Sequence, residues 1–307
     1  MINLYGLELT KLENEMISRG QKKFRATQLY SWIYQKKATT FDEMSDISKS
    51  FRDELNRDFC LSIPSIYRKQ ESSDGTIKLL LELEDGSKVE TALMPYNYGN
   101  AICVTSQVGC NMGCSFCASG LLKKKRNLEV HELVGQVLVM NNLLAEKDEL
   151  ISHIVVMGEP FDNYDNVLDF IKIMNNPKSL AIGARHITVS TCGLVEGIRK
   201  YAHEGMQTNL AISLHAPNNE LRNEIMRVNR AYPLEKVMEA VKYYEKEAGR
   251  RVTFEYIMLK DKNDTLEHAK QLVELIKGTL AYVNLIPYNE VSEMPYKRSS
   301  DNQTHLF

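Results

Sequence analysis

Three cysteines in the middle of the chain have the spacing of a cluster-binding ligand set. Cys110, Cys114 and Cys117 lie in the segment CNMGCSFC, directly after an apolar, strand-like run. Thiolates suit iron, and a 4Fe-4S cluster held by three cysteines leaves one iron without a protein ligand. The amino and carboxylate groups of S-adenosylmethionine can bind that iron, and one electron from the cluster can then break a carbon–sulfur bond to give a 5'-deoxyadenosyl radical. The segment therefore predicts a radical-forming iron–sulfur site.

Two other interpretations of these cysteines stay open, a zinc site with a fourth ligand elsewhere and simple buried thiols. Structural zinc sites usually use two pairs of ligands, and the C-x3-C-x2-C segment has no obvious second half in this chain. The six cysteines do not form a disulfide framework, because three of them fall within eight residues. We therefore expect metal or redox chemistry in a reducing compartment.

From residue 101 onward, short apolar runs alternate with amphipathic stretches. The runs are AICVTS, SHIVVMG, HITVST, NLAISLH, RVTFEYIML and YVNLIPY. Alternation of strands and helices predicts a parallel sheet with helices outside it, and continuous apolar strands indicate burial on both faces. We predict an α/β fold, a partial (β/α)6 barrel of the TIM-like kind, although the pattern alone also allows a doubly wound open sheet.

Chemistry-bearing residues follow the ends of these runs. In a (β/α) barrel the reactive groups gather at the C-terminal ends of the strands. Besides the cysteine loop, the residues at these ends are Gly158, Glu159, Ser190, Ser213, Leu214, His215 and Asn289. Polar groups that recur at strand ends are typical of a pocket for a polar cofactor.

The first part of the chain predicts a smaller α+β domain, residues 1–97, before a core domain of residues 98–307. Residues 22–57 have helical periodicity, with Phe24, Leu29, Trp32 and Ile33 near one stripe, and Asp85-Gly86 between two apolar runs indicates a hairpin. The chain has 43% hydrophobic and 25% charged residues, as globular proteins do. It has no signal-peptide pattern and no run of about 18 apolar residues. We expect a cytoplasmic monomer with no membrane contact.

Longer segments carry a resemblance to a known family. They are RATQLYSWIYQKKATTFDEMSDIS, DGSKVETALMPY, ICVTSQVGCNMGCSFCAS, ARHITVSTCG, LAISLHAPNNELR, RRVTFEYIML and VNLIPYN. The cysteine loop resembles the radical S-adenosylmethionine (SAM) superfamily, and the whole chain resembles the RlmN type of dual-specificity RNA methyltransferase. The resemblance implies methylation of carbon 2 of an adenine in 23S rRNA and of an adenine next to the anticodon in tRNA. Carbon 2 offers no nucleophile for a polar methyl transfer, so a radical route is needed.

The resemblance also implies roles for individual residues. Cys110, Cys114 and Cys117 would bind the cluster, Glu90 would accept the carbon-2 proton, and Cys103 would be the resolving cysteine that forms a disulfide with a methyl-carrying cysteine. Glu159 would contact the amino group of S-adenosylmethionine. The other residues that would contact S-adenosylmethionine are Gly158, Ser190, Ser213, Leu214, His215 and Asn289. Cys192 has no assigned role, and we expect it to pack in the core.

The partners implied are 23S rRNA, tRNA and an electron donor such as flavodoxin or ferredoxin. The target adenine must be unstacked, because carbon 2 faces the interior of a helix when the base is paired. Basic residues that could contact phosphates lie in two clusters, Lys22, Lys23, Arg25, Lys36 and Lys37 in the first and Lys123, Lys124, Lys125 and Arg126 in the second. The net charge of −2 does not decide the matter, since a local patch suffices.

Two features depart from the family's pattern. The turn around Glu159 reads MGEP, after VV, and is two residues shorter than the usual MGxGEP, and no cysteine follows Cys192 in the 307 residues. The family places its methyl-carrying cysteine near the C-terminus. We therefore expect these 307 residues alone to bind cluster, cofactor and RNA but not to methylate it. Two alternatives to carbon-2 methylation are accordingly an inactive, C-terminally truncated binding protein and the sister activity at adenine carbon 8.

Overall fold

The computed structural model describes residues 1–307, and its contacts divide them into two compact units. The first unit comprises Met1–Val108, Asn127–Val156 and Asn163–Ile187, and the second comprises Gly109–Arg126, Met157–Asp162 and Thr188–Phe307. The units interleave along the chain. The division into domains 1–97 and 98–307 stays a prediction. No helix in the structure is both long and apolar enough to span a membrane.

The first unit begins with a helical region. Its elements are β1 (Ile2–Asn3), α1 (Leu9–Ser18), α2 (Phe24–Tyr30), a π-helical turn (Ser31–Gln35), α3 (Lys49–Asp58) and β2 (Phe59–Cys60), with 3-10 turns at Leu4–Gly6 and Phe41–Glu43. Each helix buries residues one turn apart, such as Leu12 and Met16 of α1. Leu29 and Ile33 are buried as expected, but Phe24 is 53% exposed. The predicted stripe is wrong at Phe24, whose ring instead contacts the Arg25 guanidinium. Trp32 is only partly buried, and its Nε1 donates to Asp46 Oδ1 at 2.6 Å.

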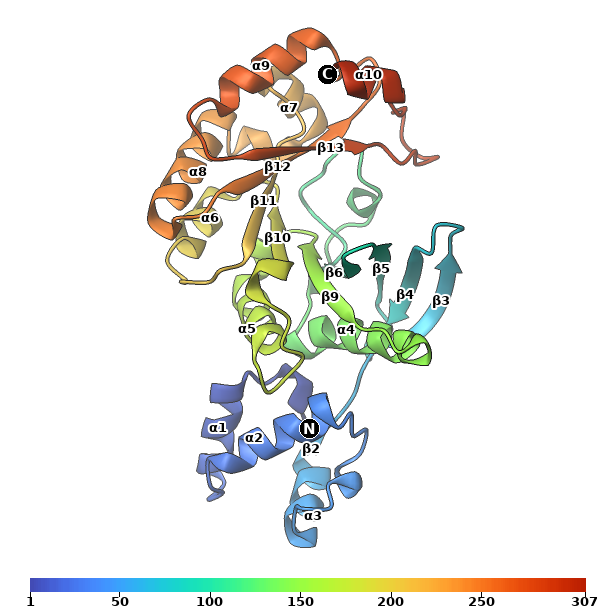
Figure 1. Ribbon diagram of the computed structural model, residues 1–307, viewed down its shortest axis with the longest axis vertical. Coiled ribbons are helices and arrows are strands. Elements are labelled where there is room, and N and C mark those ends of the chain that lie inside the picture. Colours follow the sequence, from blue (N-terminus) through green and yellow to red (C-terminus); the bar gives the residue numbers. More distant parts are fainter. The chain divides into compact units, whose positions relative to one another are not determined.

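A sheet forms the rest of the first unit, and its strands run in the order β9-β6-β5-β4-β3. The strands are β3 (Ser65–Glu71), β4 (Ile77–Glu82), β5 (Lys88–Tyr96), β6 (Gly99–Thr105) and β9 (Ile151–Met157). The pairs from β3 to β6 are antiparallel. The predicted hairpin at Asp85-Gly86 is confirmed: Gly86 has a φ of 77°, and the Asp85 carboxylate accepts the Ser87 N–H. Helices α4 (Val130–Leu144) and α5 (Tyr164–Asn175) belong to this unit (Figure 1).

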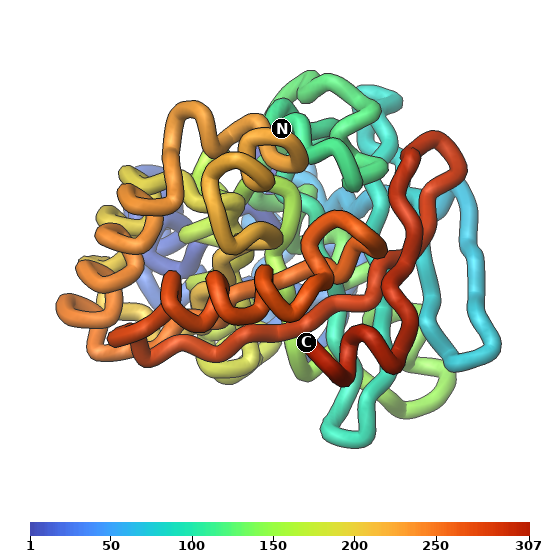
Figure 2. The backbone as a smooth tube through the Cα atoms, turned by 90° about the horizontal axis from the view of Figure 1, so that it is seen from above, coloured from blue at the N-terminus to red at the C-terminus, as the bar shows by residue number.

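The second unit is a βα repeat whose strands are parallel and follow the order β10-β11-β12-β13. Its elements are β10 (Ile187–Thr191), α6 (Val195–Tyr201), β11 (Asn209–Ser213), α7 (Asn219–Ile225), α8 (Leu234–Ala248), β12 (Val252–Met258), α9 (Leu266–Ile276) and β13 (Tyr282–Pro287). The last helix, α10 (Asp301–Leu306), can be followed in red in Figure 2. The predicted strands and the helices between them are thus confirmed. In β12, for example, alternate side chains are completely buried and the side chains between them are partly buried.

Short elements complete the chain. They are β7 (Gln107–Val108), β8 (Arg126–Asn127) and 3-10 turns at Ala118–Leu121, Ala145–Lys147, Pro160–Asn163, Ala184–His186 and Arg227–Arg230. One of these turns, Ala118–Leu121, directly follows the three cysteines. The three cysteines themselves lie outside any helix or strand. Backbone hydrogen bonds to Leu122 and Ile225 hold their loop instead.

Candidate cluster and cofactor site

The cysteine loop belongs to the second unit and is tied to its neighbours through the backbone. The Cys110 N–H donates to Leu122 O at 3.0 Å, and the Ser115 N–H donates to Ile225 O at 2.9 Å. The Ser115 and Tyr296 hydroxyls are 2.7 Å apart. Gly109 has a φ of 74°, and a Cβ there would lie 2.4 Å from Lys123 O, so only glycine fits. The sequence thus fixes the path of the loop at its entrance.

The three thiols of the loop are all free and only partly exposed. Burial raises the pKa of Cys114 to about 12, and the neighbouring thiols of Cys117 and Cys110 add to this rise. Burial also raises the pKa of Cys110. As it stands, the structure holds no three His, Cys, Asp or Glu side chains in an arrangement that would bind a metal ion. The donor set nevertheless fits an iron cluster, because three free thiols of one short loop lie close enough to influence each other's ionisation, and a cationic centre would favour their thiolate forms.

Apolar side chains surround the cysteine loop. Cys114 and Cys117 pack against a core cluster of Phe116, Cys192, Ala216, Leu221, Ile225, Met226, Leu259, Tyr288 and Tyr296. Cys192 is buried there, as expected. Tyr288 ends in a hydroxyl that donates to Phe116 O at 3.3 Å, so the segment after β13 is joined to the loop. A dry wall of this kind strengthens electrostatic interactions and keeps water from reactive species.

Glu159 is fully buried, and its carboxylate is held by three donors. Its Oε1 accepts the Thr191 hydroxyl at 2.8 Å and the Phe161 N–H at 3.2 Å, and its Oε2 accepts the Cys192 N–H at 2.8 Å. Burial raises the pKa of Glu159, and these hydrogen bonds oppose the rise. Glu159 therefore joins the GEP turn to the C-terminal end of β10. Its contact with S-adenosylmethionine stays a prediction.

His215 follows β11 in a backbone conformation that is rare for residues other than glycine. Its φ is 59°, and its Nδ1 accepts the Ile257 N–H at 3.0 Å. Its ring meets the Phe116 ring edge-on, with centroids 5.0 Å apart. Burial, aided by the charge of Arg222, lowers the pKa of His215 to about 3, so the imidazole is neutral. The segment Ser213 to His215 is thereby fixed next to the cysteine loop.

Arg222 of α7 is a functional candidate that sequence reasoning missed. The side chain is fully buried, and its guanidinium donates to Cys192 O at 2.7 Å, Leu214 O at 3.1 Å and Ser213 O at 3.2 Å. It also donates to Asn229 Oδ1 and Tyr232 O. Burial lowers the pKa of Arg222 to about 10, which still leaves it charged near neutral pH. It ties the ends of β10 and β11 together, and its only sequence signal is its place in the segment LAISLHAPNNELR.

Ser190 and Asn289 complete the predicted cofactor contacts in the second unit. Ser190 lies in β10 opposite Ala211 and is partly buried. Asn289 is exposed and directly follows the buried Tyr288. Gly158 has a φ of 89°, so the turn before Glu159 is one that glycine readily adopts. The roles of these residues stay predictions.

Glu90 and Cys103 lie in the first unit, on the paired strands β5 and β6. Glu90 is exposed, with its Oε1 3.4 Å from Lys78 Nζ. Cys103 is opposite Ala92, two residues from Glu90 on the same face of β5. Burial and the nearby Glu90 carboxylate raise the pKa of Cys103 to about 11. The structure thus brings the two predicted catalytic residues of this unit onto one face of the hairpin.

The two basic clusters are partly engaged in other contacts. Lys124 pairs with Asp162 at 2.6 Å, Lys23 pairs with Glu13 at 3.0 Å, and Lys36 lies over the Trp32 ring. The lysines that remain exposed without an ion pair are Lys22, Lys37, Lys123 and Lys125. Phosphate contact by these residues stays a prediction.

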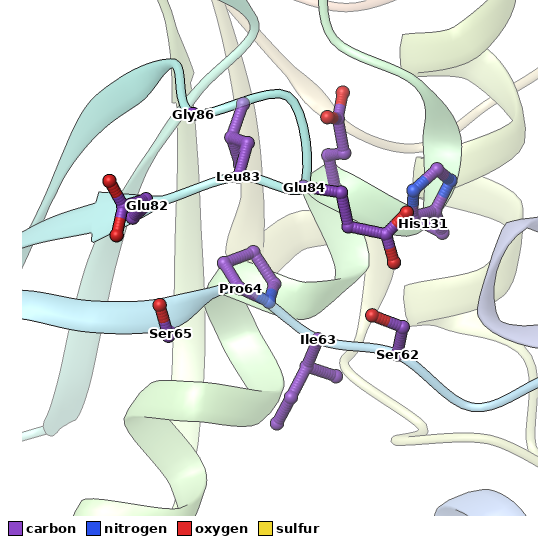
Figure 3. A pocket seen from close by; sticks show the side chains of 10 residues that line it. Ser62, Ile63, Pro64, Ser65, Glu82, Leu83, Glu84, Gly86 and His131 are labelled. Carbon is purple, nitrogen blue, oxygen red and sulfur yellow. The ribbon is translucent and has the colours of Figure 1, made fainter.

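One cavity of the first unit contains none of the predicted site residues. It measures about 320 Å³ and lies between the Ser62–Ser65 segment, the β4–β5 turn and the start of α4 (Figure 3). Glu82, Glu84 and His131 are among its lining residues. These three side chains do not form a metal-binding group. The cysteine loop therefore remains the candidate site.

The fold and the cysteine loop define a class of protein that comparison with known families confirms. The model of the radical SAM superfamily matches residues 104–276, and the model of the ribosomal RNA large subunit methyltransferase N-terminal domain matches residues 2–61. The first match includes the cysteine loop and strands β10, β11 and β12 of the second unit. The second match covers the helical region of the first unit.

Close relatives narrow the class further. The protein of Spiroplasma citri named "Probable dual-specificity RNA methyltransferase RlmN" is 53% identical over 98% of this chain and 88% of its own length. The protein of the same name from Geobacillus kaustophilus is 52% identical over 99% of this chain and 84% of its own. A crystal structure of a radical SAM methyltransferase from Sphaerobacter thermophilus superposes with a TM-score of 0.94 at 39% identity, covering 100% of this chain and 91% of that one. This chain belongs to the RlmN family of radical SAM methyltransferases.

Proposed function

We propose that this protein serves the radical methylation of carbon 2 of adenine in 23S rRNA and tRNA, with the methyl-carrying cysteine of the family's route supplied from outside these 307 residues. The observation that carries the proposal is the free three-cysteine loop, set on an apolar wall in a chain that matches RlmN relatives over nearly its whole length. Carbon-2 methylation needs a radical, and such a loop is the ligand set for generating one.

Cys110, Cys114 and Cys117 would hold the cluster, and bound S-adenosylmethionine would supply the radical at that place. The residues around them would shape its pocket. Neutral His215 and buried Arg222 fix the Ser213–His215 segment, and Glu159 fixes the turn that follows β9. Phe116 and Tyr288 would exclude water. Gly158, Ser190, Leu214 and Asn289 would complete the contacts to S-adenosylmethionine.

The first unit would act on the RNA. Glu90 is exposed and could accept the carbon-2 proton at its carboxylate. Cys103, with its raised pKa, would stay a protonated thiol until it is needed to release the product. An electron donor such as flavodoxin or ferredoxin would reduce the cluster. The exposed lysines of the two clusters, Lys22 and Lys123 among them, would contact phosphates.

The proposal is tested by deleting the gene for this protein in the organism that carries it and analysing nucleosides from 23S rRNA and tRNA by mass spectrometry. We expect 2-methyladenosine to disappear from both RNAs and to return when the gene is restored. A restored gene with Cys110, Cys114 and Cys117 all changed to Ala is the control and should not rescue. Unchanged 2-methyladenosine in the deletion strain, or loss of 8-methyladenosine instead, would refute the proposal.

A further inference from the structure

Two tyrosines of the segment after β13, Tyr288 and Tyr296, contact the cysteine loop between its second and third cysteines. We call them the tyrosine pair. The Tyr288 hydroxyl donates to Phe116 O at 3.3 Å, and the Tyr296 hydroxyl lies 2.7 Å from the Ser115 hydroxyl. Ser115 and Phe116 are the only residues between the second and third cysteines. Each residue of this short span is therefore bound to one tyrosine.

Ser115 is the centre of a chain of hydrogen bonds with a defined direction. Its hydroxyl donates to Ile225 O at 3.3 Å, because a carbonyl oxygen can only accept. A hydroxyl has a single proton, so Ser115 must accept from Tyr296. The Ser115 N–H also donates to Ile225 O, at 2.9 Å. The Tyr296 hydroxyl thus strengthens the attachment of the loop to the C-terminal end of α7.

The tyrosine pair is itself firmly held in the second unit. Tyr288 is 3% and Tyr296 8% exposed, and their rings meet edge-on with centroids 6.4 Å apart. Tyr288 directly follows β13. Two residues after Tyr296, Arg298 forms an isolated β-bridge with Leu259, which directly follows β12. The segment that carries the pair is therefore fixed to the sheet on both sides, and it can support the loop without moving.

The loop needs such support because it has no regular structure of its own. Three thiolates must converge on one cluster, so the residues between them become ordered when the cluster binds. Ordering a residue costs conformational entropy. A span that is fixed before the cluster arrives has already met part of this cost, and binding is then tighter. Residues around metal ligands also tune the electronic properties of the metal.

We propose that the tyrosine pair positions the cysteine loop for the iron–sulfur cluster, by holding the span between Cys114 and Cys117 in the conformation that the cluster requires. The inference rests on the proposed function and adds to it two positioning residues that lie about 170 to 180 positions after the cysteines in the sequence. Tyr288 also directly precedes Asn289, so the same segment carries a predicted contact to S-adenosylmethionine.

The test compares Tyr296→Phe, Ser115→Ala and the double variant as full chains reconstituted anaerobically with iron and sulfide. Each single variant should lose its cluster to an iron chelator about tenfold faster than the unchanged protein, which is the effect of one lost hydrogen bond. The double variant should lose its cluster only as fast as Ser115→Ala, because Tyr296 then has no remaining partner in the loop. The electron paramagnetic resonance spectrum of the reduced cluster should change in the same way in all three variants.

Tyr201→Phe is the matched control. It removes a tyrosine hydroxyl that forms a buried hydrogen bond with the Thr208 hydroxyl, also in the second unit but outside the cysteine loop. Tyr201→Phe should lower the midpoint of urea unfolding about as much as Tyr296→Phe does. Its rate of cluster loss and its spectrum should equal those of the unchanged protein. The control therefore separates a positioning role from a general loss of stability.

Three results would overturn the inference and leave the proposed function intact. They are an unchanged rate of cluster loss in Tyr296→Phe, a double variant in which the two single effects multiply, and equal acceleration in Tyr201→Phe. The second result would show that the two hydroxyls do not act through one hydrogen bond. If the unchanged protein holds no cluster at all, the proposed function is overturned and the inference with it.

Discussion

The cysteine loop of the second unit and the β5–β6 hairpin of the first unit present their chemistry in opposite ways. Around the loop, the polar groups are buried and saturated with hydrogen bonds, as Glu159 and Arg222 illustrate. On the hairpin, Glu90, Tyr96 and Tyr98 are exposed. A small cofactor that forms radicals needs a closed, dry pocket, whereas a macromolecular substrate needs an accessible surface. The difference indicates that the two units divide these tasks between them.

The largest effect that this division predicts is at the loop. Changing Cys110, Cys114 and Cys117 together to Ala should abolish binding of iron and sulfide and the brown colour of anaerobically reconstituted protein, because no other thiols of the second unit could replace three ligands. Iron and sulfide analysis measures the result, with Cys60→Ala as a control that keeps its cluster. Full cluster content in the triple variant would show that the cluster assignment is wrong.

A smaller effect concerns the framework behind the loop. Arg222→Met should lower the free energy of unfolding by about 3 kcal/mol, because it leaves several buried carbonyl groups without a donor. Urea unfolding measures the change. Arg230→Met, at an exposed arginine of the same region, should stay within about 0.5 kcal/mol of the unchanged protein. Equal unfolding midpoints for the two variants would show that Arg222 does not stabilise the framework behind the loop.

The smallest effect concerns the thiol of the hairpin. Since the pKa of Cys103 is raised to about 11, the group stays protonated at neutral pH and becomes the reactive thiolate only as the pH rises toward that value. Alkylation of Cys103, followed at the peptide level, should accelerate about tenfold per pH unit between about pH 7 and 9. Glu90→Gln should react faster at each pH, because the carboxylate helps to raise the pKa. An alkylation rate that no longer rises with pH above pH 8 would contradict the raised pKa of Cys103.

Much of the fold was predictable because it depends on local patterns. The apolar runs became strands, and Asp85-Gly86 became a hairpin, since each signal lies within a few neighbouring residues. Phe24 was placed wrongly, because helical spacing does not show that a charged neighbour will cover a ring at the surface. Trp32 of the same predicted stripe is likewise only partly buried.

The site was predictable only in part. Cysteine spacing and strand ends identified the loop, but Arg222 resembled an ordinary solvated residue in NNELR. Its burial depends on carbonyl groups from β10, β11 and the segments after α7, which are brought together only by the fold.

The most direct test of the central claim, that the second unit holds a radical-forming cofactor site, is formation of 5'-deoxyadenosine from S-adenosylmethionine by the reduced, reconstituted protein. The account predicts that the product forms slowly without RNA and that Asn289→Ala slows it without loss of cluster iron, since Asn289 is exposed and contributes little to folding. It also predicts no product from the triple cysteine variant. A protein that holds its full cluster yet yields no 5'-deoxyadenosine, or an Asn289→Ala variant that cleaves at the full rate, would contradict the proposed pocket.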